Sequence, residues 1–178
     1  LSSLYSMKLK ELPLVDVFVN VLDNDKPGLD IRQLVETTPG VFAPDTSTEV
    51  LEGAFGFGDA YTVALTANPI TGETVTVYLA TDAQSTAKSK ATGLAYLTFT
   101  DTNWNTPQIV LVNAVDDSIV EGADLSTITH QIASTGGKYS AFTAADYPKL
   151  AVTVYDDETP GTVVQETDGS TVVVEGSA

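Results

Sequence analysis

Residues 150–164 read LAVTVYDDETPGTVV, and residues 17–31 read VFVNVLDNDKPGLDI. When Asp156 is set against Asp23, both stretches show an alternating apolar strand, then an acidic turn, then Pro-Gly. A second pair of words follows the turns, TEVLEGA at 48–54 and TVVVEGS at 171–177. Internal repetition of this kind marks repeat architectures, so we interpret the chain as a window on a tandem array of modules.

The spacing of these words gives the size and the boundaries of one module. The acidic turns lie 133 positions apart and the Glu-Gly words 123 apart, so a repeat of about 125–135 residues with one ordinary loop insertion fits both. Small solenoid units are shorter, and this size is typical of a self-standing β-sandwich. We predict the last strands of a preceding module in 1–28, a complete module in 29–158, and the first strand of the following module in 159–178.

Period-two alternation of apolar residues runs through the chain. It is clearest in 15–21, in 73–81 and in 150–154, where Val and Leu alternate with Thr, Tyr, Asp and Asn. Residues 109–114 are apolar on both faces, which predicts a strand in the interior of a sheet. Further strands are expected at 29–36, 48–51, 59–66, 94–100 and 125–133.

Turn residues separate these strands every 8–14 residues, which indicates an all-β antiparallel sandwich or barrel. A short helical turn is expected at 143–147. The segments 37–47 and 82–92 are rich in polar and small residues, and we expect them to be mobile loops.

The composition excludes several classes of function. The 178 residues include 8 Lys and Arg against 24 Asp and Glu, a formal net charge of −16. Nucleic acids and anionic membranes are therefore poor partners, because their affinity comes from basic side chains. The charge requires counter-ions, either a bound divalent cation or diffuse monovalent ions. There are no cysteines, no apolar run long enough for a membrane span, and no signal-like segment at Leu1.

The densest group of carboxylates follows the strand at 109–114. Residues 114–125 read AVDDSIVEGADL and place Asp116, Asp117, Glu121 and Asp124 within nine positions. Ca²⁺ takes six to eight oxygen ligands from flexible loops, whereas Mg²⁺ demands tighter octahedral geometry. Transition metals favour His or Cys, and this chain has one His and no Cys. A solvated acidic turn without any ion remains the alternative for this stretch.

Carboxylates also follow other predicted strands. Glu52 ends the strand at 48–51, Asp82 follows 73–81, and Asp156, Asp157 and Glu158 follow 150–154. Strand ends from both sheets of a sandwich can meet at one pole, so these side chains are able to converge.

Several words of the sequence together resemble the Calx-beta domain. They are VLEG (50–53), YTVALT (61–66), VTVYLATD (75–82), LTFTDTNWNTPQIVLVNAVDDSIVEG (97–122) and LAVTVYDDE (150–158), in the order of that family. The resemblance implies an immunoglobulin-like sandwich of seven antiparallel strands that holds Ca²⁺ at one pole.

Carried over word by word, the resemblance also implies a ligand set. The implied metal ligands are Glu52, Asp82, Asp116, Asp117, Glu121, Asp156 and Asp157, with Glu158 in place of a frequent third Asp. In the preceding module Asn24 replaces one of these acids, and Glu175 is the expected Glu-Gly ligand of the following module.

The function expected from this reading is a calcium-binding structural or adhesive module of a long extracellular or cell-surface protein. Calcium would stiffen the joints between neighbouring modules, which are the expected partners, along with other surface proteins or glycans. One alternative is a module that recognises carbohydrate or protein through the loops at 37–47 and 82–92. Another is a subunit of a surface filament.

Catalysis is not expected. His130 has no nucleophile motif around it, and we expect a structural or surface role. Trp104 is expected to pack at the edge of the sandwich rather than to stack on a sugar. The word Asp45-Thr46-Ser47 lacks the apolar stretch that follows it in aspartic proteases.

Overall fold

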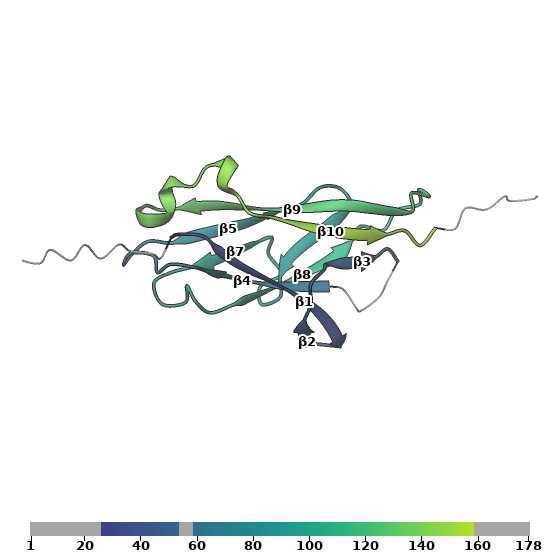
Figure 1. Cartoon of the computed structure of the whole chain (residues 1–178), viewed down its shortest axis with the longest axis horizontal. Helices are drawn as coiled ribbons and strands as arrows, with labels where there is room; N and C mark the ends of the chain where they lie inside the picture. Colours follow the sequence, from purple (N-terminus) through teal and green to yellow (C-terminus); the bar gives the residue numbers. More distant parts are fainter. Residues whose placement is uncertain (1–25, 54–58, 159–178) are drawn as a thin grey trace, which may run out of the picture.

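A computed structural model describes residues 26–53 and 59–158 of the chain (Figure 1). These residues form ten strands and two short 3₁₀ turns. In chain order they are β1 (Leu29–Thr38), β2 (Val41–Pro44), β3 (Glu49–Leu51), β4 (Asp59–Leu65), β5 (Val75–Ala80), β6 (Ser85–Ser89), β7 (Tyr96–Phe99), β8 (Gln108–Ala114), β9 (Ala123–Ser134), η1 (Gly137–Ala141), η2 (Ala144–Asp146) and β10 (Lys149–Tyr155). No helix among the described residues is long and apolar enough to cross a membrane.

The strands form two five-stranded sheets packed face to face. The first sheet has the order β2-β1-β4-β8-β6 and the second has the order β3-β10-β9-β5-β7. All pairs are antiparallel except β3 with β10, which run parallel. The all-β sandwich expected from the alternation is therefore confirmed, and it is consistent with the immunoglobulin-like fold that the resemblance implies. The resemblance also implies seven antiparallel strands, whereas the described residues form ten, because short edge strands such as β2 and β3 add to both sheets and β3 pairs in parallel.

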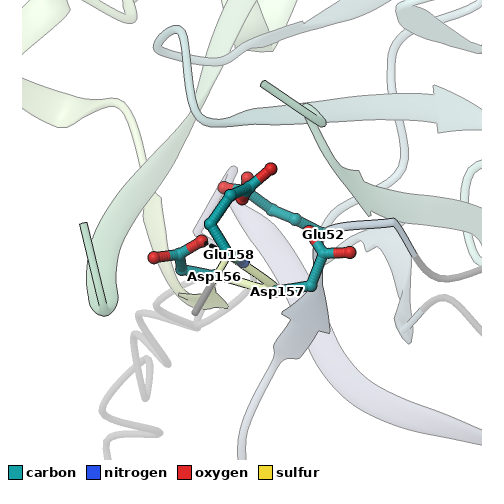
Figure 2. A group of neighbouring side chains, drawn as sticks. All are labelled: Glu52, Asp156, Asp157 and Glu158. Carbon is teal, nitrogen blue, oxygen red and sulfur yellow. Dashed lines mark hydrogen bonds between the residues drawn. The ribbon is translucent and has the colours of Figure 1, made fainter. Parts of the chain in front are cut away.

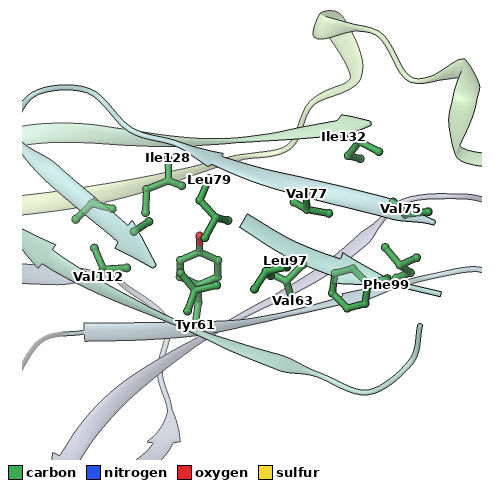
Figure 3. Packing of buried hydrophobic residues seen from close by; sticks show 14 of the residues in the cluster. Tyr61, Val63, Val75, Val77, Leu79, Leu97, Phe99, Val112, Ile128 and Ile132 are labelled. Atoms are coloured by element: carbon green, nitrogen blue, oxygen red, sulfur yellow. The ribbon is translucent and has the colours of Figure 1, made fainter. Parts of the chain in front are cut away.

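The core lies between the inner faces of the two sheets (Figure 3). Tyr61 and Val63 of β4 and Val112 of β8 face Val77 of β5 and Ile128 of β9, and all five are fully buried. The alternation that predicted these strands exists because every second side chain points into this core. β8 lies between β4 and β6, so the prediction of an interior strand at 109–114 is confirmed.

Two expected loops proved to contain strands. The segment 37–47 holds β2, which pairs with β1 across a tight turn at Gly40, where φ is +81°. The segment 82–92 holds β6, which pairs with β8 at the edge of the first sheet. The inward residues of β6 are Ser85, Ala87 and Ser89, so its alternation is between small and polar side chains and carries little hydrophobic signal.

The remaining local expectations can be compared with the structure directly. The helical turn expected at 143–147 is η2, which begins with a capping box between Thr143 and Asp146. Trp104 is partly buried against the core, in the structural role expected for it. The strand expected at 15–21 and the modules expected in 1–28 and 159–178 lie largely or wholly outside the described residues.

His130 is buried at the centre of the sandwich. It is 0% exposed, and burial lowers its pKa. Its Nδ1 lies 3.1 Å from the carbonyl oxygen of Pro148, and its Nε2 lies 3.0 Å from the Tyr61 hydroxyl. Because a carbonyl only accepts, Nδ1 carries the proton and Nε2 accepts from Tyr61. The imidazole is therefore a neutral structural bridge.

The two ends of the sandwich differ in their chemistry. We call the end where the described chain begins, with Lys26–Gly28, the β4–β5 loop and η1, the N-terminal pole. The opposite end, with the β5–β6 and β8–β9 loops and the residues that follow β3 and β10, is the C-terminal pole (Figure 1). Glu73, at the N-terminal pole, is buried and accepts hydrogen bonds from Ser134 and from three backbone N–H groups. Burial opposes ionisation there, but these donors outweigh it and lower the pKa of Glu73.

Candidate metal site at the C-terminal pole

The directions of the strands explain why acidic segments that are distant in the sequence lie at one pole. β5 and β10 are both antiparallel to β9, and β3 is parallel to β10, so β3, β5 and β10 all end at the same place. β8 of the other sheet also ends there. The residues that follow these strands are the acidic ones: Glu52, Asp82, the 115–122 loop and 156–158.

Four carboxylates form the centre of this site (Figure 2). Glu52, Asp156, Asp157 and Glu158 each offer an oxygen, and these four oxygens lie within 4.8 Å of one another. Two oxygens on opposite sides of a calcium ion, each bonded at about 2.4 Å, lie about 4.8 Å apart. The four side chains therefore fit the coordination sphere of one hard cation, and we call them the four-carboxylate cluster.

Glu52 is the buried member of the cluster. It is 4% exposed, and burial raises the pKa of its carboxyl. A backbone N–H of Asp117 counters this in part, while the charges of Asp117, Asp156 and Glu121 raise the pKa of Glu52 further. A charge in such a position is costly unless a partner of opposite sign is present.

Asp156 joins the β8–β9 loop to the end of β10. Its Oδ2 accepts from the backbone N–H groups of Glu121 at 2.7 Å and Gly122 at 2.9 Å. Its Oδ1 accepts from the N–H of Glu158 at 2.7 Å. These donors, Gly122 first, lower the pKa of Asp156 to about 2. This carboxylate therefore stays ionised and holds the loop against the cluster.

Glu158 carries the clearest unsatisfied group of the cluster. Its Oε2 is buried and has no hydrogen-bond partner among the described residues. A hydrogen bond to Asp156, burial, and the charges of Asp157 and Asp156 together raise the pKa of Glu158 to about 7. In the absence of a cation, a proton on Glu158 at neutral pH therefore reduces the negative charge of the cluster.

The other implied ligands are placed less centrally. Asp116 and Asp117 are exposed in the β8–β9 loop, and Asp117 accepts from the N–H of Ile119. Glu121 accepts from the side-chain amide of Gln84 at 2.6 Å. None of these three residues belongs to the four-carboxylate cluster, although the charges of Asp117 and Glu121 act on Glu52.

Asp82 has a structural set of partners. Its Oδ1 accepts from Ser126 Oγ at 2.6 Å, and its Oδ2 accepts from the N–H of Thr127 at 2.9 Å. Since Ser126 donates to Asp82, the hydroxyl of Ser85 must donate to Ser126, 2.6 Å away. Burial opposes ionisation of Asp82, but these donors lower its pKa. Asp82 therefore anchors the β5–β6 turn to β9.

Sequence reasoning missed two residues that shape this pole. Gln84 donates to Glu121 and also to Asp124, at 3.2 Å, and thereby connects two loops. No pattern in the sequence pointed to it.

Gly53 is the second residue that sequence reasoning missed, although the repeated Glu-Gly motif could have pointed to it. It has a φ of +62°, and a Cβ at this position would clash with Oδ2 of Asp157. The Glu-Gly motif thus combines Glu52, a buried ligand candidate, with a glycine that leaves room for the side chain of Asp157 beside it.

Neither a scan of protein-family models nor a search of curated proteins finds a match for this chain. The resemblance to Calx-beta domains therefore remains a prediction carried by the words quoted above.

Proposed function

We propose that this chain is a calcium-binding structural module of a long extracellular or cell-surface protein. The observation that carries the proposal is the four-carboxylate cluster, in which a buried Glu52 and an unpartnered Glu158 oxygen face Asp156 and Asp157. Oxygen-only donors in this number match the preference of Ca²⁺. His and Cys, which transition metals favour, are absent from the cluster.

Calcium would act here as a mechanical tie. Glu52 follows β3 and the other three ligands follow β10, while Asp156 also holds the β8–β9 loop. An ion bound by these residues would connect three segments at the last described positions before residues 159–178. The joint toward the next module would therefore be stiffer with calcium than without it.

Calorimetric titration of the chain with Ca²⁺ tests the proposal. The wild-type chain should release or absorb binding heat and unfold at a higher temperature in calcium, with a much weaker response to Mg²⁺. The double substitution Glu52→Gln/Asp157→Asn should remove the heat. Glu49→Gln, an exposed acid on β3 outside the cluster, is the matched control. A wild-type chain without binding heat and without a calcium-dependent shift in melting temperature would exclude the proposal.

The stiffening role has its own test. Small-angle scattering from a chain with several consecutive modules should show a longer maximum dimension in calcium than in chelator. Identical profiles in both conditions would leave calcium binding intact and remove the mechanical role.

A recognition module remains the second candidate, and one surface feature favours it. Tyr78 of β5 and Tyr96 of β7 stand opposite each other on the outer face of the second sheet, with ring centroids 6.0 Å apart. Both are substantially exposed, and neighbouring exposed aromatic rings are suited to contact sugars or proteins. Binding of this chain to glycans immobilised on a glass slide would support this candidate if the double substitution Tyr78→Ser/Tyr96→Ser abolished it.

A further inference from the structure

Exposed apolar side chains gather at the C-terminal pole. Twelve large apolar side chains are exposed among the described residues, and six of them lie at this pole: Leu51, Val115, Ile119, Val120, Leu125 and Tyr155. Tyr155 stands opposite Leu51 across the β10–β3 pair, and Leu125 stands opposite Thr153 on the same face of β9 and β10. We call these six residues the C-terminal patch. Grouped apolar exposure of this kind marks interaction sites.

The N-terminal pole carries a concave apolar surface. A groove of about 700 Å³ is lined by Pro27, Leu29, Ala141, Phe142 and Pro148, with Lys138 among its polar residues. Phe142 stacks on the buried Tyr139, with ring centroids 5.7 Å apart, so this wall of the groove is packed against the core. We call it the N-terminal groove.

The two poles differ in charge as well as in shape. The four-carboxylate cluster lies beside the C-terminal patch, and none of the six Lys and Arg residues in the described part of the chain belongs to the segments of that pole. At the groove, Lys138 lines the wall and Lys26 precedes it. The acid there, Asp146, accepts from the hydroxyl and the N–H of Thr143. The groove, where Lys138 and Asp146 balance, is therefore less acidic than the C-terminal pole, so it repels that pole less than a second acidic pole would.

We propose that the N-terminal groove receives the C-terminal patch of a second copy of this fold, head to tail. The repeated words explain why such copies meet. The stretch DNDKPG (23–28) matches DDETPG (156–161), so an acidic turn ends one module and the following Pro-Gly belongs to the next groove. A connection of about four residues reaches at most about 14 Å, which keeps the two poles in contact range.

A contact between two different surfaces does not close as a two-fold dimer, because it leaves one free pole on each copy. Within a tandem chain, head-to-tail repetition therefore builds a line of modules. This inference rests on the array role proposed above, but it does not require calcium. A tether would raise the effective concentration of the partner pole to the millimolar range, so a weak contact is sufficient.

Disulfide trapping on the full chain tests this docking, because the chain has no cysteine of its own. Lys138→Cys places a thiol at the groove, and Ile119→Cys places one in the patch, where the native side chain is 59% exposed. Equal amounts of the two variants are mixed at about 1 mM, the concentration that a tether would supply, and are oxidised slowly in chelator and again in calcium. Random pairing of equal amounts gives one half mixed dimer, whereas docking should raise the mixed fraction above one half.

A matched control and a second pair keep the test independent of one position. Lys88→Cys, on the outer side of β6, should give random pairing with either variant. The pair Ala141→Cys and Leu125→Cys should repeat the excess of mixed dimer. Adding Ile119→Asp to the Leu125→Cys chain should reduce that excess, because it replaces an apolar contact of the patch by another acid.

Random pairing for both pole pairs would overturn the inference. Hydrogen exchange in dilute chain gives a second way to overturn it. If Lys138→Glu makes the amides of residues 1–25 exchange faster, that flanking segment, and not a second copy, occupies the groove. Calcium binding heat without an excess of mixed dimer would reject the docking alone. An excess in chelator without calcium heat would reject the calcium proposal alone.

Discussion

Replacing Glu52 by glutamine should stabilise the module in chelator and reduce the stabilisation that calcium gives. Glu52 is 4% exposed and contributes an oxygen that lies within 4.8 Å of three other carboxylate oxygens. Its raised pKa has burial as the first cause, followed on the raising side by the charges of its neighbours. Without a cation, ionised Glu52 therefore opposes folding, and the neutral amide removes that opposition.

The size of the effect follows from the spacing of the carboxylate oxygens, which is at most 4.8 Å. Two unit charges at that distance repel by about 3.5 kcal/mol at an effective dielectric of 20 and by about 0.9 kcal/mol in bulk water. Asp157 is exposed, so the lower part of that range applies to the site. We expect Glu52→Gln to raise the free energy of unfolding in chelator by about 1–2 kcal/mol. The melting temperature should rise by roughly 3–10 °C.

In calcium, by contrast, the carboxylate of Glu52 should stabilise the folded chain, because it binds the ion. At free calcium 100-fold above the dissociation constant, a bound ion stabilises the wild-type chain by about 2.7 kcal/mol. A tenfold weaker site in the variant would give about 1.4 kcal/mol at the same calcium concentration.

Urea unfolding followed by circular dichroism, in chelator and at several calcium concentrations, measures both quantities. Glu49→Gln on the same strand should stay within about 0.5 kcal/mol of wild type in both conditions. Destabilisation by Glu52→Gln in chelator would refute the reasoning, because it would mean that the buried carboxylate is held by favourable partners. An unchanged calcium increment would remove Glu52 from the ligands.

Three other positions give predictions of their own. His130 has a lowered pKa in the folded chain, so the imidazole of the unfolded chain takes up a proton first as pH drops below about 6.5, and the free energy of unfolding should fall. Urea titrations at several pH values should show a weaker pH dependence for His130→Gln. Glu73 also has a lowered pKa, so its contribution is present above about pH 4.5 and lost in acid; Glu73→Gln should cost about 3 kcal/mol at pH 7, and this difference from wild type should shrink toward pH 3. Gly53→Ala should cost about 1–2 kcal/mol through its φ of +62° and should also weaken calcium binding by displacing Asp157. Gly40→Ala, with φ of +81° and open space around its Cβ, should carry the backbone cost alone, so equal calcium affinities of the two variants by calorimetry would contradict the role of Gly53.

The alternation of apolar and polar residues located the strands correctly where large apolar side chains line the core. The strands expected at 73–81, 109–114 and 150–154 correspond to β5, β8 and β10 with ends shifted by two residues or fewer. The prediction was wrong for β6, because its inward residues are Ser and Ala. β2 was missed because its four residues pair only with β1, at the edge of the sheet.

The candidate site divides in the same way. Acidic words at strand ends pointed to one pole, and Glu52, Asp156, Asp157 and Glu158 do lie together there. The same reasoning could not rank these residues against Asp82, whose donors come from Ser126 and Thr127 on β9. Partners this distant along the chain leave no local signal.

Local chemistry therefore decided which segments extend, where they turn and where negative charge accumulates, because each depends on neighbours within a few residues. The tertiary structure decided which charges meet. The parallel pairing of β3 with β10 places Glu52 beside the residues that end β10, about a hundred positions later in the chain. Burial then separates the cluster from an ordinary acidic turn, because a carboxylate removed from water needs a partner and one left in water does not.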